Sequence, residues 1–122
     1  MWTYNSRTGA LSHDGVFAGE CYSGFGSGLN NPDLERDVEV GPIPRGRYRI
    51  GIWFDDQHGK GPLVAHLYSP DVKAKFGRDG FMVHGDNRQL DHTASRGCII
   101  AAHVLRLAMA NSQDQEFEVV AE

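Results

Sequence analysis

The sequence predicts a single domain over residues 1–122 that is built mainly from β-strands. The chain has 122 residues, 40% of them hydrophobic, and this size is typical of one domain with one core. Glycine occurs 15 times, and runs of strong helix formers are few. Short segments that alternate between polar and apolar residues end at turn residues, which is the pattern of strands in a sheet.

The first strands and the one predicted helix lie at opposite ends of the chain. A hairpin is expected over residues 2–13, and the turn at Asp14-Gly15 leads into a strand over residues 16–22. A helix is expected over residues 101–111, because five apolar side chains fall on one helical face. These side chains are Ala101, Val104, Leu105, Ala108 and Met109.

The middle of the chain supplies the remaining strands. The clearest covers residues 47–54, where Tyr48, Ile50 and Ile52 alternate with polar residues. Residues 71–80 are interpreted as a connector and residues 87–95 as a polar loop. Three further strands are expected, over residues 63–69, 81–84 and 116–121.

No periodic pattern is present between Ser23 and Pro44. This segment is rich in glycine, asparagine and proline, so it is interpreted as a long ordered loop. Long loops in compact domains are often functional, and we expect this one to form one wall of a cleft. The alternative is a loop that only covers one edge of the sheet.

Charge and hydropathy exclude two classes of partner. Twelve Lys and Arg residues against sixteen Asp and Glu residues give a net charge of −4, and the basic residues are scattered, so we expect no nucleic-acid binding. The apolar stretches are too short to span a bilayer, so no membrane insertion is expected. No signal-peptide pattern opens the sequence, so work outside the cytoplasm requires another delivery route or a trimmed parent chain.

Two separated motifs predict thiol chemistry. Ser95–Cys98 reads Ser-Arg-Gly-Cys before an apolar pair, and His84 ends another apolar run. An imidazole can convert a thiol to the nucleophilic thiolate, and Gly97 lacks the Cβ that would block a substrate carbonyl. We therefore predict Cys98 as nucleophile and His84 as general base, with Ser95 and Gly97 in supporting roles. The amides of Gly97 and Cys98 could stabilise an oxyanion.

Two neighbouring groups are expected to tune this pair. The predicted helix after Cys98 would favour the thiolate through its N-terminal dipole. His84 should emerge at the sheet edge, and its second ring nitrogen needs an orienting partner. Candidates are Asp86, Asp91, Ser95 or a main-chain carbonyl, and we favour a carbonyl near Ser95.

These motifs resemble the signature of the L,D-transpeptidase catalytic domain. That family carries a His-Gly pair, here His84-Gly85, then a loop and a Ser/Thr-His-Gly-Cys segment, here 95–98. Residues 2–4, 41–48 and 76–81 also resemble a shorter branch of these enzymes, which includes toxins delivered by bacterial type VI secretion systems. The resemblance covers nearly the whole chain.

The resemblance implies a β-sandwich-like fold and a cysteine-dependent L,D-carboxypeptidase or L,D-transpeptidase, including D-amino acid exchange. The substrate would be the peptidoglycan stem tetrapeptide, which reacts through a Cys98 acyl-enzyme without cofactor or metal. The toxin branch further implies secretion without a signal peptide, action in the periplasm of a target bacterium, and a cognate immunity protein as partner.

The chain departs from the family pattern at Arg96, where histidine is usual. An arginine cannot act as a base, but it can hold a carboxylate in a bidentate pair. We therefore predict Arg96 to bind substrate, with help from Arg78 or Arg88. Gly85 and Asp86 complete the predicted substrate-binding residues.

Other interpretations remain open at this point. Cys21 precedes His84, which is the order of papain-like cell-wall cysteine peptidases, although Cys21 also fits a buried core position. Cys21 and Cys98 could instead form a disulfide. A zinc site could draw on His58, His66, His84, Asp86, Asp91 and His92. A non-catalytic peptidoglycan-binding or phage structural module is the last alternative.

Overall fold

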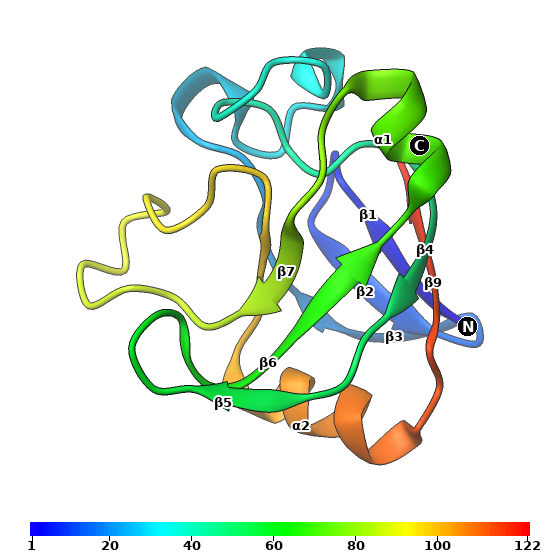
Figure 1. Ribbon diagram of the computed structural model, residues 1–122, viewed down its shortest axis with the longest axis vertical. Coiled ribbons are helices and arrows are strands. Elements are labelled where there is room, and N and C mark those ends of the chain that lie inside the picture. The colour runs from blue at the N-terminus through cyan, green and yellow to red at the C-terminus, as the bar shows by residue number, and fades with distance from the viewer.

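The strands form one strongly curled sheet in the computed structural model, which describes residues 1–122 (Figure 1). The sheet has nine strands in the order β3-β2-β1-β9-β4-β6-β7-β8, and β5 pairs with β6 alone. The bounds are β1 (Trp2–Asn5), β2 (Ala10–His13), β3 (Val16–Glu20), β4 (Gly46–Ile50), β5 (Phe54–Asp56), β6 (Gly61–Tyr68), β7 (Phe81–His84), β8 (Ile99–Ile100) and β9 (Glu116–Val120). The predicted mainly-β fold is therefore confirmed.

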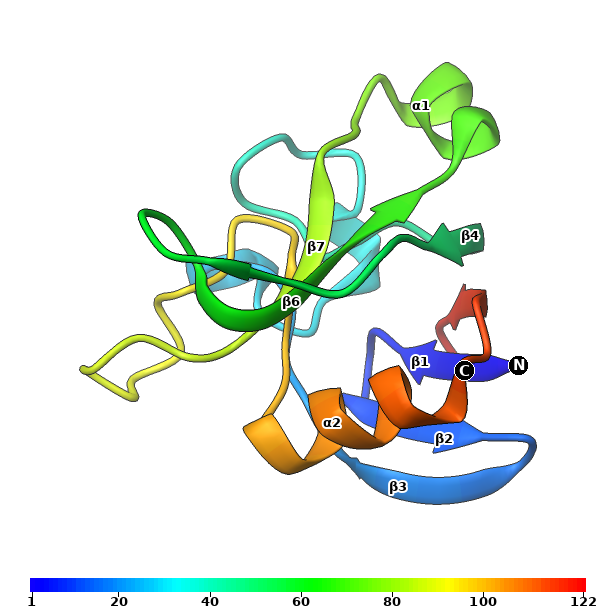
Figure 2. The same ribbon diagram turned by 60° about the horizontal axis from the view of Figure 1, so that its bottom comes forward.

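The core lies inside the curl of the sheet. It is a cluster of 17 buried residues that draws on both halves of the chain, including Tyr4, Leu11, Ile43 and Phe117. Helix α2 (His103–Ser112) lies beside the first strands (Figure 2), where Leu105 lies against Gly19 of β3 and the Ser112 hydroxyl accepts from the Trp2 indole of β1. Neither helix in the protein has the length and apolar character that crossing a membrane requires.

The predicted helix is confirmed, but its buried face differs from the expected one. Met109 is buried, whereas Val104 is 69% exposed. Arg106 is buried instead, because its guanidinium donates to the carbonyls of Ala101, Pro62 and Leu63. Main-chain acceptors at the edge of the core thus offset the cost of burying that charge.

A second helix, α1 (Pro70–Phe76), lies in the segment interpreted as a connector. The Ser69 hydroxyl accepts from the Val72 amide, Pro70 opens the helix, and Gly77 ends it in the left-handed region at φ 66°. These residues are favourable caps. The helix is only 7 residues long, too short to produce a readable apolar period.

Two predicted strands end earlier than expected. β4 stops at Ile50, although the Gly51 amide still bonds to the His66 carbonyl of β6, and Ile52 is 84% exposed rather than buried. β3 stops at Glu20, although the Cys21 amide still bonds to the Gly9 carbonyl just before β2. Local alternation continues past both points, but pairing with the neighbouring strand stops within one residue of each.

The segment 23–44 is ordered, as predicted. It contains two short 3-10 helices, Gly26–Gly28 and Pro32–Leu34. The Ser23 hydroxyl joins its two ends, because it accepts from the Ile43 amide at 2.8 Å and donates to the Gly97 carbonyl at 3.0 Å. This segment is therefore fixed directly to the predicted nucleophile loop.

Candidate catalytic site

The pairing of β7 with β8 places the predicted base and nucleophile on one face of the sheet. The two strands run parallel, with Val83 opposite Ile99 and His84 opposite Ile100. Val83 and Ile99 belong to the buried core. Because side chains alternate along a strand, His84 and Cys98 face away from that core.

The imidazole of His84 is oriented by the next residue in the chain. Its Nδ1 lies 2.7 Å from the carbonyl oxygen of Gly85. A carbonyl only accepts, so Nδ1 carries the proton and Nε2 presents a lone pair. Nε2 is buried and makes no hydrogen bond, with the sulfur of Cys98 or with any other group. The orienting group is a main-chain carbonyl, but it belongs to Gly85 and not to a residue near Ser95.

His84 is more enclosed than expected. Only 3% of the residue is exposed, because β7 is an interior strand that pairs with β6 and β8. Burial lowers the pKa of His84 below its ordinary 6.5, and the charges of Lys60 and Arg106 lower it further. The hydrogen bond to Gly85 acts in the opposite direction. The neutral ring is the form that can accept a proton.

Cys98 is a free, partly exposed cysteine. Burial raises the pKa of its thiol, while a hydrogen bond from the Met82 backbone and the charges of Lys60 and Arg78 act to lower it. The predicted helix begins only at His103, with β8 between it and Cys98. Because a helix dipole acts within about one turn, we assign this helix no part in ionising the thiol.

Ser95 holds the nucleophile loop in shape. Its hydroxyl donates to the Cys98 carbonyl at 2.6 Å and accepts from the amides of Gly24 and Gly97 at 2.9 and 3.1 Å. A serine hydroxyl has one proton to donate and two lone pairs, so its capacity is filled. Ser95 is fully buried. These contacts fix the backbone beside Cys98, and the supporting role of Ser95 in catalysis stays a prediction.

Arg78 is also buried, and its guanidinium serves the main chain. Nη1 donates to the carbonyls of Glu35 and Pro42, and Nη2 donates to those of Gly41 and Arg96. Arg78 was predicted to bind substrate. It lines the Cys98 pocket, so substrate binding stays a prediction, while its hydrogen bonds join the segment 23–44 to the nucleophile loop.

Two pockets have Arg96 in common. One, of about 310 Å³, contains Cys98 and is partly lined by Val38 and Glu39 of the long loop, as expected for a cleft wall. The other, of about 380 Å³, contains His84. Arg96 is exposed, and its guanidinium carbon lies 3.9 Å from the centre of the Phe25 ring. The two predicted catalytic groups thus line adjoining spaces on either side of one arginine.

Gly85 and Asp86 line the His84 pocket, as their predicted binding roles require. One carboxylate oxygen of Asp86 accepts from the Tyr22 hydroxyl at 2.7 Å and from the Asn87 amide at 2.9 Å. Gly85 packs against Arg106, so that a Cβ at Gly85 would lie 2.9 Å from Nη2. Arg88, the alternative partner for substrate, lines neither pocket.

Two residues near the site were missed in the sequence. Lys60 lies in the β5–β6 turn and lines the His84 pocket. No local signal distinguishes it from a surface lysine. Arg106 could have been found, because it lies three positions before Met109 and so shares its helical face.

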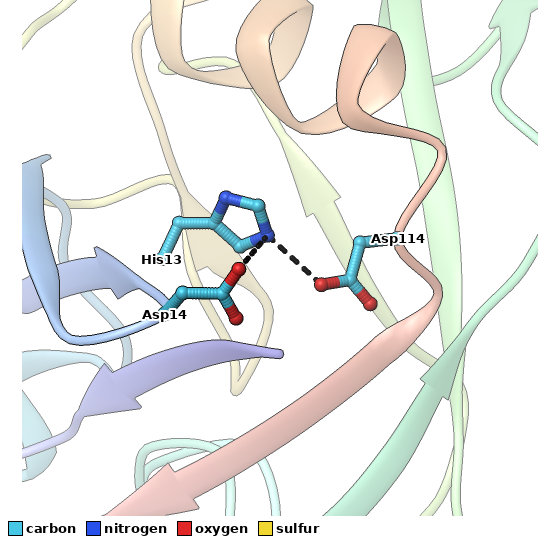
Figure 3. Close-up of side chains that lie close together, drawn as sticks. All are labelled: His13, Asp14 and Asp114. Atoms are coloured by element: carbon cyan, nitrogen blue, oxygen red, sulfur yellow. Dashed lines mark hydrogen bonds and ion pairs between the residues drawn. The ribbon is translucent and has the colours of Figure 1, made fainter.

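The structure bears on the zinc and papain-like alternatives. The possible metal ligands that lie together are His13, Asp14 and Asp114, none of which belongs to the predicted zinc set (Figure 3). His13 Nε2 lies 2.8 Å from Asp114, which ties the end of β2 to the chain before β9. Cys21 is a buried free cysteine whose pKa is raised by burial to about 12, and no helix begins there.

The fold is that of the L,D-transpeptidase class. The structure of L,D-transpeptidase 1 from Mycobacterium tuberculosis matches 98% of this chain over 60% of its own, with a TM-score of 0.51 and 15% identity. The helical cell shape determining protein Pgp2 from Campylobacter jejuni matches 99% of this chain over 46% of its own, with a TM-score of 0.59 and 20% identity. The chain therefore spans about half the length of Pgp2.

The Tlde1 domain model matches residues 18–121. Since this is most of the chain, the protein belongs to the Tlde1 domain family, a family of type VI secretion L,D-transpeptidase effectors. No curated protein matches the sequence. The resemblance drawn from the motifs is thereby confirmed.

Proposed function

We propose that this protein is a cysteine-dependent L,D-carboxypeptidase and L,D-transpeptidase that also exchanges D-amino acids on peptidoglycan tetrapeptide stems. One observation carries the proposal. Strands β7 and β8 pair in parallel, so that His84, with an unpartnered Nε2, lies on the same face as the free thiol of Cys98. A base and a nucleophile from separated segments are what covalent acyl transfer needs.

In the first half of the reaction, Nε2 of His84 takes the proton of the Cys98 thiol. The sulfur bonds to the carbonyl carbon at the L-centre of diaminopimelate, and the carbonyl electron pair moves to oxygen. The Gly97 amide is engaged with Ser95, so we assign the oxyanion to the Cys98 amide. The carbon–nitrogen bond then breaks, and the amine of D-alanine leaves with the proton from His84.

The resulting thioester is resolved by the acceptor that reaches it. Water gives a tripeptide and a free enzyme, which is carboxypeptidase activity. The amine of a second stem gives a 3–3 cross-link, and a free D-amino acid gives exchange. In each case His84 accepts the proton of the attacking group and returns it to the sulfur, so the second half reverses the first.

The resting pair is neutral in this proposal. The pKa of His84 is lowered and that of Cys98 is raised, so the imidazole and the thiol both stay uncharged at pH 7. Proton transfer therefore accompanies attack on the substrate. The charges of Lys60 and Arg78 act to lower the pKa of the thiol and reduce the cost of forming the thiolate.

The biological setting follows from the family. We propose a secreted type VI effector that acts in the periplasm of a target bacterium. Its producer would need an immunity protein that covers the pockets around Arg96. Membership in the Tlde1 domain family supports this setting.

The test is mass spectrometry of muropeptides after incubation with wild type and variants. Wild type should convert tetrapeptide stems to tripeptide, cross-linked or exchanged products. Cys98→Ala and His84→Gln should remove these products, while Cys21→Ala should keep them in a folded protein. Absence of all three products with wild type, or their persistence with Cys98→Ala, would overturn the proposal.

A further inference from the structure

The pocket around His84 has an excess of positive charge. Lys60 and Arg96 line it beside the neutral His84, and Asp86 is its one acidic residue. The Asp86 carboxylate already accepts hydrogen bonds from Tyr22 and Asn87. The pocket thus presents cations whose nearest acidic neighbour is engaged elsewhere.

Neither cation has an acidic partner within the protein, although the Arg96 guanidinium lies over the Phe25 ring. Lys60 and Arg96 take part in none of its ion pairs. His84 is only 3% exposed, and its Nε2 also lacks a hydrogen-bond partner. A buried polar atom without a partner is unusual, and beside two unpaired cations it indicates a site that receives a polar ligand.

The turn that carries Lys60 is held on both sides. The Lys60 amide donates to the Asp56 carboxylate at 2.9 Å, and the Leu63 amide donates to the Asp55 carboxylate at 3.0 Å. A Cβ at Gly59 would collide with the Asp56 carboxylate, so that carboxylate fills the inside of the turn. The side chain of Lys60 therefore projects from a fixed backbone.

Arg106 fixes this turn relative to His84. Its Nη1 donates to the carbonyls of Pro62 and Leu63, next to Lys60. Its Nη2 packs against Gly85, next to His84. The β5–β6 turn and the loop that follows β7 extend from the same side of the molecule (Figures 1 and 2). One buried guanidinium thus sets the relation between the cation and the base.

We propose that Lys60, together with Arg96, binds the carboxylate of the D-amino acid that leaves the stem peptide, and of the D-amino acid that enters during exchange. This inference rests on the proposed function. His84 gives its proton to the leaving nitrogen, and that nitrogen and the carboxylate are attached to the same carbon. Cations that line the His84 pocket therefore meet the carboxylate, whereas the Cys98 pocket receives the acyl side.

The charge of Lys60 acts on both reacting groups, as expected if the substrate carboxylate binds beside them. Its charge lowers the pKa of both His84 and Cys98, and no other charged residue acts on both. A carboxylate bound to Lys60 therefore lies within the field of the two reacting groups. A bidentate partner such as Arg96 adds orientation to the charge.

The test compares two donors, a diaminopimelate tetrapeptide that ends in D-alanine and the same peptide ending in D-alaninamide. Wild type should prefer the acid by about tenfold or more in kcat/KM, as expected for a hydrogen-bonded charge pair. Lys60→Met should lose most of this preference, mainly through KM for the acid. Lys75→Met, an exposed lysine of α1 outside the pocket, is the matched control and should keep it.

A binding measurement separates this inference from the proposed function. In a Cys98→Ala background, calorimetry should show tighter binding of the acid than of the amide, and Lys60→Met should equalise the two. If wild type shows no turnover but this binding difference is present, the proposed chemistry fails and the carboxylate site stands. If Lys60→Met retains the acid preference in turnover and in binding, the carboxylate site is wrong.

Discussion

The guanidinium of Arg78 lies directly against Gly97, where a Cβ would come within 2.6 Å of Nη2. Gly97 also has a φ of 133°, which L side chains rarely adopt. The glycine before the nucleophile is therefore required by the packing of a buried arginine and by the backbone itself. The same Arg78 holds the long loop, so this contact joins three segments beside Cys98.

Gly97→Ala should destabilise the protein and remove its activity. Strain at the positive φ and collision with Arg78 together should lower the free energy of unfolding by about 2–4 kcal/mol. Denaturant unfolding measures the loss. Gly15→Ala is the control, since its φ is +84° but nothing lies within 4 Å of the added Cβ, so it should cost about 1–2 kcal/mol and leave turnover intact. Equal costs for both variants would refute the role given to Arg78.

Arg78→Lys should lower the free energy of unfolding by about 3 kcal/mol, because one ammonium cannot reach four carbonyls held by a planar guanidinium. Turnover should fall as the nucleophile loop loses its support. The exposed Arg47 provides a control, for which a change to lysine should alter stability by less than about 0.5 kcal/mol. Unchanged stability of Arg78→Lys would show that the guanidinium does not hold the long loop and the nucleophile loop together.

Ser95→Ala should remove the hydroxyl that bridges Gly24, Gly97 and Cys98. Two buried amides then lose their acceptor, so stability should fall by about 2–3 kcal/mol and kcat should fall with it. Ser12→Ala, on β2 and outside this network, should change neither. A variant at Ser95 with normal stability and normal kcat would show that the network does not position the nucleophile.

The fall of kcat/KM at acid pH should follow the protonation of His84. Its pKa lies below the ordinary 6.5, so the base stays neutral and kcat/KM should hold until the pH falls below 6.5. Steady-state rates on a soluble tetrapeptide between pH 4.5 and about 8 would measure this fall. A midpoint above 6.5 would mean that the ring is not buried in the active protein.

Stability should depend on pH through the same residue. The folded pKa of His84 is depressed, so the unfolded chain takes up this proton first as the pH falls. His84 therefore contributes a loss of stability that begins as the pH drops below 6.5 and grows until the folded ring is also protonated. His84→Gln should lose less stability than wild type between pH 7 and 5. Identical pH dependence in the two proteins would exclude this linkage.

Much of the site could be predicted because its signals are local. His84 ends an apolar strand, and Gly97-Cys98 precedes another, so neighbouring residues alone place both at strand ends. Two of the three hydrogen bonds of the Ser95 hydroxyl, to Gly97 and Cys98, lie within three positions of it. The burial of the His84 imidazole, by contrast, could not be predicted from the residues next to it in the sequence. Its burial depends on the pairing of β7 with both β6 and β8.

The amino-acid sequence by itself determined the strands, the ordered loop and the two residues assigned to the chemistry, since alternation and glycine content act over a few neighbours. The tertiary structure alone decided that Arg78 and Arg106 are buried and hold main-chain segments together, and that Lys60 lines the pocket of His84. Each of these roles depends on main-chain carbonyls or backbone turns far along the chain, as in the contact of Arg106 with Pro62. Such partners meet only when the sheet closes around its core, so no pattern of neighbouring residues records them.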